Sequence, residues 1–419
     1  MDEESSSDGK ERKGEDRSLG MFALLLCIPA IIITSGSYVT GNFFGITIVY
    51  WILGLLLVSY GYYLFKRQDA LSMGSAEKSL LIFTGWGLFY VLLSLTKVNQ
   101  LMQADLAYDL SFLPRQAVYF FVLPAAILFR EERYMKWPER FVKKYGEILF
   151  WVLFAGHMLY FKSNTLLVIP QLLLCWLSLK LDTYHRGFRW IRIAALMLAP
   201  LPDYGELSIL IMRGIFFVIC VIPRRLTRIM MRLMAVGMLV VIVTCLILPQ
   251  IISPNDAPDG NSAWRLIIWK EEETILANTN YLGAGYGTSY PSKTYLQGVN
   301  EREEWQYMAQ NGYTQYERMF VTAPHNSFIS LTMRTGIIGL LLFLVYLGLL
   351  FWNLVRHKGL PPKSACFALF AGVVLILFNV GLESPGYLLA FVFCLGMCSW
   401  EGKKLEGQDR ILMENGEAA

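Results

Sequence analysis

Residues 323–343 read "APHNSFISLTMRTGIIGLLLF", in which His325, Asn326 and Arg334 interrupt a run that is otherwise largely apolar. Apolar blocks of roughly 16–22 residues recur along the chain and are long enough to cross a ~30 Å hydrocarbon core. The 419-residue chain is 55% hydrophobic and 17% charged, whereas soluble domains carry about 25% charged residues. The blocks lack an alternating polar face, which argues against a β-barrel. The sequence therefore predicts an all-α polytopic membrane protein.

We expect about twelve transmembrane helices, nine of them within residues 19–252 and three within residues 323–400. The first span follows a charged tail without a cleavage site, so we expect it to be retained. The flanking tails are residues 1–18, which we expect to be disordered, and residues 401–419. The predicted spans are 19–36, 43–65, 79–96, 112–129, 147–161, 164–180, 190–202, 206–222, 233–252, 323–354, 364–380 and 386–400.

Lys and Arg predict the orientation of these spans, because short basic connections stay in the cytoplasm. Residues 130–146, 224–232 and 356–363 are rich in Lys and Arg, whereas the intervening connections "SGSYVTGN", "PLPDYGE" and "GLESPG" contain neither. Both termini are then cytoplasmic, and residues 253–322 form one large external loop between spans nine and ten. The net charge of +4 follows from this topology and does not indicate a nucleic-acid partner.

Three arginines, Arg115, Arg213 and Arg334, are predicted to lie in the external half of the membrane. Charged side chains inside spans are costly and mark functional sites. An anionic ligand would relieve their mutual repulsion, and the guanidinium group pairs bidentately with phosphate oxygens. A lipid-linked diphosphate fits these needs. The simpler alternatives are snorkelling of Arg115 or Arg334, contact of Arg334 with a neighbouring loop, and pairing of Arg213 with Asp203 or Glu206.

His325 stands at the external mouth of the tenth span, directly after Pro324. It could act as a base, donate to an oxyanion or bind phosphate as a cation. The simpler alternative is an interfacial histidine whose ring is satisfied by a backbone group. In a regular helix from residue 325, nine residues at 100° would place Arg334 on the opposite face, so we do not assume that the two side chains meet.

The external loop is predicted to contain an amphipathic helix over residues 263–277, with Arg265, Trp269 and Glu272 on one face. The run "LGAGYGTSY" (282–290) follows, and its glycines permit a tight turn and close approach of a ligand. Tyr286 within it is a candidate glycan contact. All seven cysteines fall inside predicted spans, so we expect neither a disulfide in this loop nor a zinc site.

Several motifs resemble one family, the O-antigen ligases and Wzy-type polysaccharide polymerases of bacterial inner membranes. His325-Asn326 is followed by nine residues, Gly336, two residues and Gly339, which matches the late motif of that family. "MRG" (212–214) resembles its Ser-Arg-Gly step, with Met in place of Ser, and "WRLIIW" (264–269) resembles its arginine-bearing loop helix. The resemblance covers roughly residues 206–345.

The resemblance implies a glycosyltransferase that takes a glycan from an undecaprenyl diphosphate carrier and transfers it to an acceptor hydroxyl outside the inner membrane. It implies no nucleotide sugar, no cofactor and no metal. Carried over to this sequence, Arg213 and Arg265 would grip the diphosphate. His325 would serve as the base or as a further diphosphate contact. The wider substrate-binding set is Arg115, Arg334, Asn326 and Tyr286, and chain-length regulators and flippases are expected partners.

The leading interpretation is a polymerase that joins lipid-linked repeat units of O-antigen, capsule or exopolysaccharide. Ser327 after the His-Asn pair favours this over a ligase, because ligases of the family more often carry an acid there. The nearest alternative is an O-antigen ligase that moves finished glycan to lipid A-core or another acceptor. Alternatives of another class are a lipid-linked glycan transporter or a membrane scaffold. Glu383, Asp203 and Glu206 are unranked candidates for a catalytic acid or an arginine partner.

Overall fold

The computed structural model describes most of the chain from residue 73 onward. The described residues are 42–43, 46–47, 73–96, 105–130, 132–159, 168–185, 187–201, 206–253, 256, 260–292, 319–320, 324–379 and 381–414. The predicted tail 1–18, the predicted span 19–36 and most of the predicted span 43–65 therefore lie outside the described residues.

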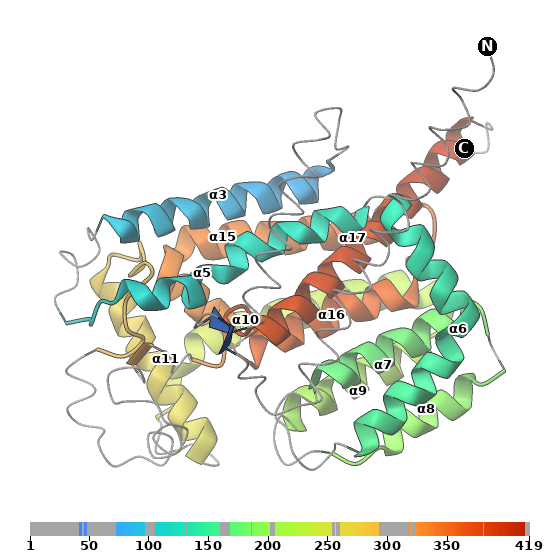
Figure 1. Ribbon diagram of the computed structural model, residues 1–419, viewed down its shortest axis with the longest axis horizontal. Helices are drawn as coiled ribbons and strands as arrows, with labels where there is room; N and C mark the ends of the chain where they lie inside the picture. Colours follow the sequence, from blue (N-terminus) through green and yellow to red (C-terminus); the bar gives the residue numbers. More distant parts are fainter. Residues whose placement is uncertain are drawn as a thin grey trace.

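Helices dominate the architecture (Figure 1). In chain order they are α3 (Ser75–Leu95), η1 (Leu110–Phe112), α5 (Leu113–Val122), η2 (Leu123–Arg130), α6 (Glu132–Leu159), α7 (Val168–Leu181), α8 (Arg189–Leu198), α9 (Glu206–Val221), η4 (Arg224–Leu226), α10 (Thr227–Ile251), α11 (Gly260–Asn278), α15 (Ser327–Val355), α16 (Lys363–Leu377) and α17 (Pro385–Glu414). Two short strands, β1 (Asn42–Phe43) and β2 (Ile46–Thr47), pair in antiparallel register.

Four helical segments are long and apolar enough to cross a membrane, namely Ser75–Leu95, Leu110–Arg130, Arg224–Ile251 and Ser327–Val355. Shorter apolar helices are Val168–Leu181, Leu207–Val221 and Lys363–Leu377. Each predicted span from 79–96 onward overlaps one or more helices of the structure within the described residues. The helical, membrane-spanning character of the chain is thus confirmed, while the total of twelve spans and the cytoplasmic location of both termini stay predictions.

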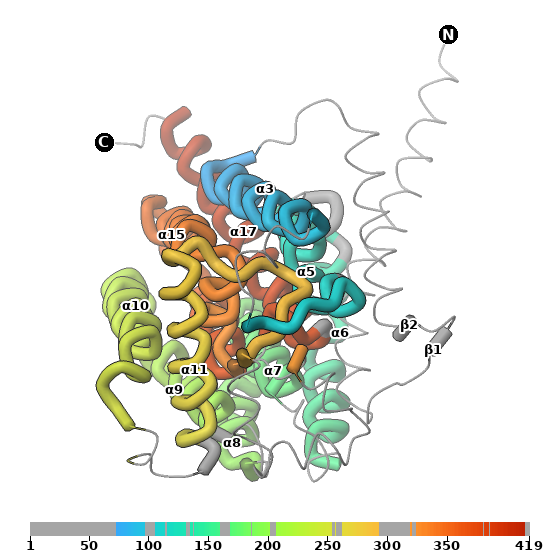
Figure 2. The backbone as a smooth tube through the Cα atoms, turned by 90° about the vertical axis from the view of Figure 1, so that its left-hand side faces the viewer, coloured from blue at the N-terminus to red at the C-terminus, as the bar shows by residue number. Residues whose placement is uncertain are grey.

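The helices differ in how much of their surface the protein covers. In α16 every side chain from Ser364 to Leu377 is buried, so this helix forms the centre of the bundle. In contrast α10 lies at its edge (Figure 2) and exposes Leu233, Val236 and Val240. A helix that is apolar all round must face either protein or lipid. The sequence of α10 is therefore suited to a lipid-facing position.

The helix α15 runs beside α3, and aromatic rings join the two (Figure 1). The ring of Phe83 in α3 lies 5.0 Å from that of Phe343 in α15 and 5.1 Å from that of Phe120 in α5. Gly87 permits this packing, because a Cβ there would fall 2.1 Å from the ring of Phe120. These contacts fix α15, which begins beside His325.

Polar contacts join the connections between helices in two groups, one on each predicted side of the membrane. The predicted cytoplasmic connections contact each other, while the turn at Glu383 contacts the start of α15 through Ser330. In the cytoplasmic group, the pairs are Arg130 with Glu77 (3.2 Å) and Glu406 (2.8 Å), Lys180 with Glu139 (3.1 Å) and Glu401 (2.6 Å), and Arg228 with the carbonyl oxygen of Gly359 (2.9 Å).

The last helix is longer than the predicted span 386–400, because α17 continues to Glu414. Its extension is held by Glu401, which is 5% exposed and pairs with Lys180, and by the buried side chain of Leu405. Residues 401–414, part of the predicted cytoplasmic tail, therefore continue the helix of the last predicted span.

Candidate active site

The helix α11 lies against the entry to α15 and holds His325 in place. The indole Nε1 of Trp269 donates to the carbonyl oxygen of Pro324 at 2.6 Å. The ring of Trp264 meets the His325 imidazole edge to face, with centroids 5.2 Å apart and planes at 80°. His325 has a φ of +52°, in the left-handed region that few non-glycine residues adopt. Its position thus depends on α11 as well as on α15.

The predicted loop helix 263–277 is confirmed within α11, and its predicted polar face is turned inward. Trp269 and Glu272 are buried, and Arg265 lies close enough to His325 to act on it electrostatically. These three side chains are four and three residues apart in the sequence, which places them on one face of a helix. This face packs on α15 and on the residues directly before it.

Asn326 begins α15 as its N-cap. Its Oδ1 accepts hydrogen bonds from the backbone N–H groups of Phe328 (3.0 Å) and Ile329 (3.3 Å), which a helix start leaves without intrahelical partners. The regular helix therefore begins after His325, and the angle between His325 and Arg334 cannot be counted from residue 325. Asn326 is 1% exposed, so its first role is to fix this helix start.

The glycine-rich loop docks on a kink in α15 at Gly336, where φ is +71°. The loop takes up the backbone groups that the kink releases. These hydrogen bonds are Ala284 N–H to Met333 O (2.6 Å), Gly285 N–H to Arg334 O (3.0 Å) and Ile337 N–H to Tyr281 O (3.1 Å). A Cβ at Gly336 would fall 2.5 Å from the carbonyl oxygen of Leu282. Gly336 of the motif therefore serves loop docking.

Arg334 is fully buried and binds the backbone of the glycine-rich loop. Its Nη1 donates to the carbonyl oxygens of Gly285 (3.1 Å) and Thr288 (2.9 Å), and its guanidinium lies 4.2 Å from the ring centroid of Tyr290. The structure thus shows contact with a neighbouring loop, which was the simpler alternative for Arg334. Its Nε and Nη2 atoms have no hydrogen-bond partner among the described residues, and diphosphate binding by them stays a prediction.

Two buried carboxyl groups accompany Arg334. Glu272 is 1% exposed, and neither of its oxygens has a hydrogen-bond partner among the described residues. Burial raises the pKa of Glu272 well above its usual range, against the opposing charge of Arg334. Glu383 is 7% exposed and accepts hydrogen bonds from the hydroxyl groups of Tyr290 and Ser330. Sequence spacing placed Glu272 on the inner face of α11, but nothing in the sequence ranked either acid.

The electrostatic surroundings of His325 make its imidazole neutral. His325 precedes the membrane-spanning segment, and burial together with the positive charge of Arg265 lowers its pKa to about 4. At neutral pH the ring therefore carries no charge and can accept a proton or a hydrogen bond. This state fits the predicted role beside a reacting sugar better than a role as a cationic diphosphate contact.

Arg213 belongs to a different polar group from His325. It is 4% exposed and donates to the carbonyl oxygens of Ala199 and Pro200 (3.2 Å) and to Oε1 of Gln171 (3.4 Å). These partners lie on α7 and after α8, and the predicted alternative partner Asp203 lies outside the described residues. The hydrogen-bond partners of Arg213 within the described residues do not include α11, so a joint grip with Arg265 stays a prediction.

The remaining predicted residues are divided between the site and the core. Arg115 is partly exposed and close enough to Glu383 for its charge to oppose the rise in the pKa of that carboxyl. The ring of Tyr286 is fully buried, and its hydroxyl lies 2.6 Å from that of Tyr119. This ring packs the glycine-rich loop against α5, and a glycan contact by Tyr286 stays a prediction.

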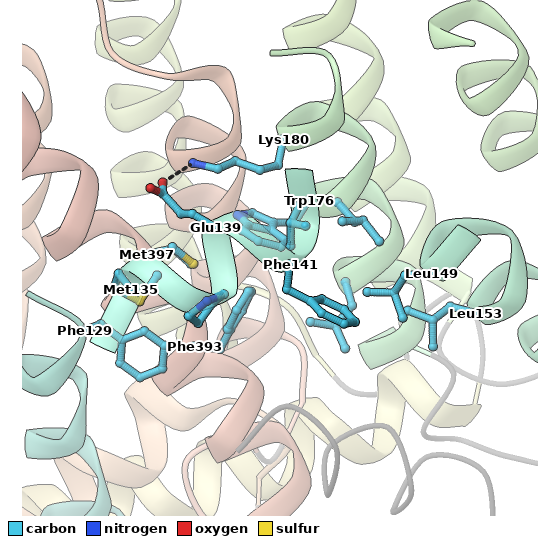
Figure 3. A pocket seen from close by; sticks show the side chains of 14 residues that line it. Phe129, Met135, Glu139, Phe141, Leu149, Leu153, Trp176, Lys180, Phe393 and Met397 are labelled. Carbon is cyan, nitrogen blue, oxygen red and sulfur yellow. Dashed lines mark hydrogen bonds and ion pairs between the residues drawn. The ribbon is translucent and has the colours of Figure 1, made fainter. Parts of the chain in front are cut away.

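An apolar pocket lies elsewhere, between η2, α6, α7 and α17 (Figure 3). Its aromatic lining includes Phe129, Phe141, Trp176 and Phe393. The cation at its edge, Lys180, is paired with Glu139 at 3.1 Å, so it is not free to bind a phosphate. Neither His325 nor Arg265 lines this pocket. The polar region between α11 and α15 is therefore the candidate active site.

Residues 205–344 match a family model described as O-antigen ligase. The matched segment runs from α9 into α15 and contains Arg213, Arg265, His325 and Arg334, whereas Arg115 and Glu383 lie outside it. No curated protein and no solved structure matches the chain. The apolar helices and this match together indicate an integral membrane protein. Residues 205–344 are thus similar to the O-antigen ligase family, and the resemblance predicted for roughly residues 206–345 is confirmed for this segment.

Proposed function

We propose that the protein is a Wzy-type polymerase. It transfers a glycan from an undecaprenyl diphosphate carrier to a sugar hydroxyl of another lipid-linked repeat unit during assembly of a surface polysaccharide. The observation that carries the proposal is the close approach of Arg265 to a neutral His325 at the start of a membrane-spanning helix, within the family-matched segment. The site faces the exterior of a bacterial inner membrane and works without a metal.

Arg265 has the chemistry to hold the donor. Its side chain is partly exposed, and a guanidinium offers planar, parallel donors to diphosphate oxygens. Negative charge develops on the diphosphate as its bond to the sugar breaks, and a fixed cation in a poorly solvated site stabilises that charge. In this proposal Arg213 binds the carrier as a second cation, from the neighbouring polar group on α9.

The choice of polymerase over ligase rests on Ser327. Its hydroxyl accepts a hydrogen bond from the N–H of Leu382 (3.1 Å) and donates to the carbonyl oxygen of Asn379 (3.4 Å). A small neutral side chain thus occupies the position where ligases of the family more often carry an acid. The ligase function is the second candidate, favoured by the description of the matched family.

The test is an assay of purified protein in lipid with an undecaprenyl diphosphate-linked repeat unit, followed by separation of products by length. We expect a ladder of products from the wild-type protein. We expect Arg265→Lys to lose about 100-fold in rate, as expected for loss of one transition-state donor. We expect His325→Gln to lower the rate as well, because the imidazole packs on Trp264 and lies near Arg265. Lys270→Ala is the matched control, because Lys270 lies exposed on the same helix α11, and it should retain the ladder.

Other outcomes distinguish the alternatives. A single transfer that requires a second type of acceptor would identify a ligase. Donor binding that depends on Arg265 but leads to no transfer, across several donors, would identify a transporter and would contradict both enzymatic candidates.

A further inference from the structure

The turn between α16 and α17 delivers one carboxyl group, that of Glu383, to the first turns of α15. The backbone N–H of Leu382 donates to the hydroxyl of Ser327, which fastens the turn to the helix start. One turn further along α15, the hydroxyl of Ser330 donates to Oε1 of Glu383. Ser330 follows the first helical residue, Ser327, by three residues, roughly 4–5 Å along the helix axis, and His325 lies two residues before Ser327. Glu383 and His325 therefore share the mouth of the same helix.

The orientation of the Glu383 carboxyl is fixed from two sides. The hydroxyl of Tyr290 donates to Oε2, and that of Ser330 donates to Oε1. Tyr290 is itself held by the guanidinium of Arg334, 4.2 Å from its ring centroid. Hydroxyl donors on both oxygens stabilise the anionic form of a carboxyl group. Such a carboxylate is positioned to accept a third hydrogen bond from a ligand.

Exposure separates the two acids of the site. Glu383 is 7% exposed, whereas Glu272 is 1% exposed and makes no hydrogen bond within the described residues. Glu383 is therefore the acid that a substrate can reach with the smaller rearrangement. The titratable or charged groups around Glu383 are Tyr119, Tyr286, Tyr290, Glu272, Arg115 and Arg334.

The pKa values of the two possible bases, Glu383 and His325, also favour Glu383 as the base. Burial raises the pKa of Glu383 to about 8, with Arg115 opposing the rise, whereas burial and Arg265 lower the pKa of His325 to about 4. A general base works best when its proton affinity lies near the operating pH. At about pH 8 a substantial fraction of Glu383 is ionised, and this carboxylate binds a proton far more tightly than the imidazole does.

We propose that Glu383, and not His325, is the general base that removes the proton from the acceptor hydroxyl. This inference rests on the proposed function. The proton of the acceptor O–H group moves to a carboxylate oxygen of Glu383, and the acceptor oxygen forms a bond to the anomeric carbon of the donor sugar. The bond from that carbon to the carrier diphosphate breaks, and the diphosphate leaves with the electron pair beside Arg265. Tyr290 and Ser330 act as positioning residues for the carboxylate.

The experiment measures the rate of glycan transfer against pH for four proteins: wild type, Glu383→Gln, Ser330→Ala and His325→Gln. We expect the wild-type rate to rise with pH around an apparent pKa near 8. In Glu383→Gln that rise disappears and the rate falls by at least about 100-fold, while the affinity for the donor is retained. In Ser330→Ala the carboxylate loses one donor, so the rise moves to higher pH. His325→Gln keeps the rise at its wild-type position.

Thr332→Ala is the matched control for Ser330→Ala. Within the described residues the Thr332 hydroxyl bonds only to the carbonyl oxygen of Phe328 (2.6 Å), in the same helix α15. This variant should leave the pH profile unchanged. The inference is overturned if Glu383→Gln keeps the rise, or if His325→Gln abolishes it. Should Glu383→Gln fail to fold, an unshifted profile in Ser330→Ala overturns the inference instead. A wild-type protein that transfers no glycan overturns the proposed function, which is a different result.

Discussion

Glu272 is a buried acid whose energetic effect depends on pH. Its folded-state pKa is raised above the unfolded value of about 4.3 by burial. The folded protein therefore binds this proton more tightly than the unfolded chain does. The contribution of Glu272 to the free energy of unfolding is fully present below the pKa of this group in the unfolded chain. It is lost as pH rises through the raised pKa of the group in the folded protein. For each unit by which burial raises the pKa of Glu272, the free energy of unfolding falls by about 1.4 kcal/mol at alkaline pH.

We predict that Glu272→Gln flattens the pH dependence of the free energy of unfolding, because an amide of similar shape does not titrate. Its melting temperature in detergent should approach that of the wild type at about pH 4–5 and exceed it at about pH 8. Glu273→Gln is the control, since Glu273 is only partly buried on the same helix, and it should follow the wild-type curve. Parallel curves for Glu272→Gln and wild type would contradict the assignment of a raised pKa.

Single residues also show what the sequence could predict about the site. Arg265, Trp269 and Glu272 were assigned to one face correctly, because helical periodicity depends only on neighbours along the chain. The roles of Glu383 and Tyr286 were not predictable, because they depend on contacts with residues 53 and 167 positions away. Charge and residue type could flag Glu383 but could not show that Ser330 and Tyr290 hold it.

The helix α15 is the element on which the candidate site depends, and its kink is the feature that admits the glycine loop. We predict that Gly336→Ala destabilises the protein by at least about 1–3 kcal/mol, since a side chain there combines a strained φ with contact to the Leu282 carbonyl. Glycan transfer should be lost with it, because the loop can no longer dock. Thermal unfolding and the transfer assay measure the two effects.

Gly348→Ala is the matched control for this element. Gly348 lies in the same helix, and a Cβ there would meet no other atom within 4 Å. An alanine in a regular helix is more favourable than glycine by roughly 0.5–1 kcal/mol, so this variant should be as stable as wild type or more so. Equal stability of Gly336→Ala and Gly348→Ala would show that the kink is dispensable.

The helices themselves were largely predictable from the sequence, because apolar runs of spanning length leave the backbone no alternative to helical hydrogen bonding in lipid. The kink was not, because a glycine inside an apolar run most often serves close packing of helices. The continuation of α17 beyond residue 400 was not predictable from the sequence either. It follows from ion pairs such as that between Lys180 and Glu401, which join residues 221 positions apart.

For the whole molecule, the two groups of connections lead to a prediction about sidedness. Asn278 is exposed at the end of α11, in the predicted external group, and Glu414 is exposed at the end of α17, in the predicted cytoplasmic group. In intact cells a membrane-impermeant maleimide should label Asn278→Cys and should label Glu414→Cys only after permeabilisation. The parent protein is the background control, and its six described cysteines are buried. Labelling in the reverse order would place the candidate site in the cytoplasm.

The last helix connects the predicted external side of the molecule to its predicted cytoplasmic side. The helix α17 is 30 residues long, about 45 Å at 1.5 Å per residue. It begins two residues after Glu383 and ends beyond Glu401, Glu406 and Asp409, which pair with Lys180, Arg130 and His357. The helix thus links a cluster of ion pairs at one end to the turn that carries the Glu383 carboxyl group at the other.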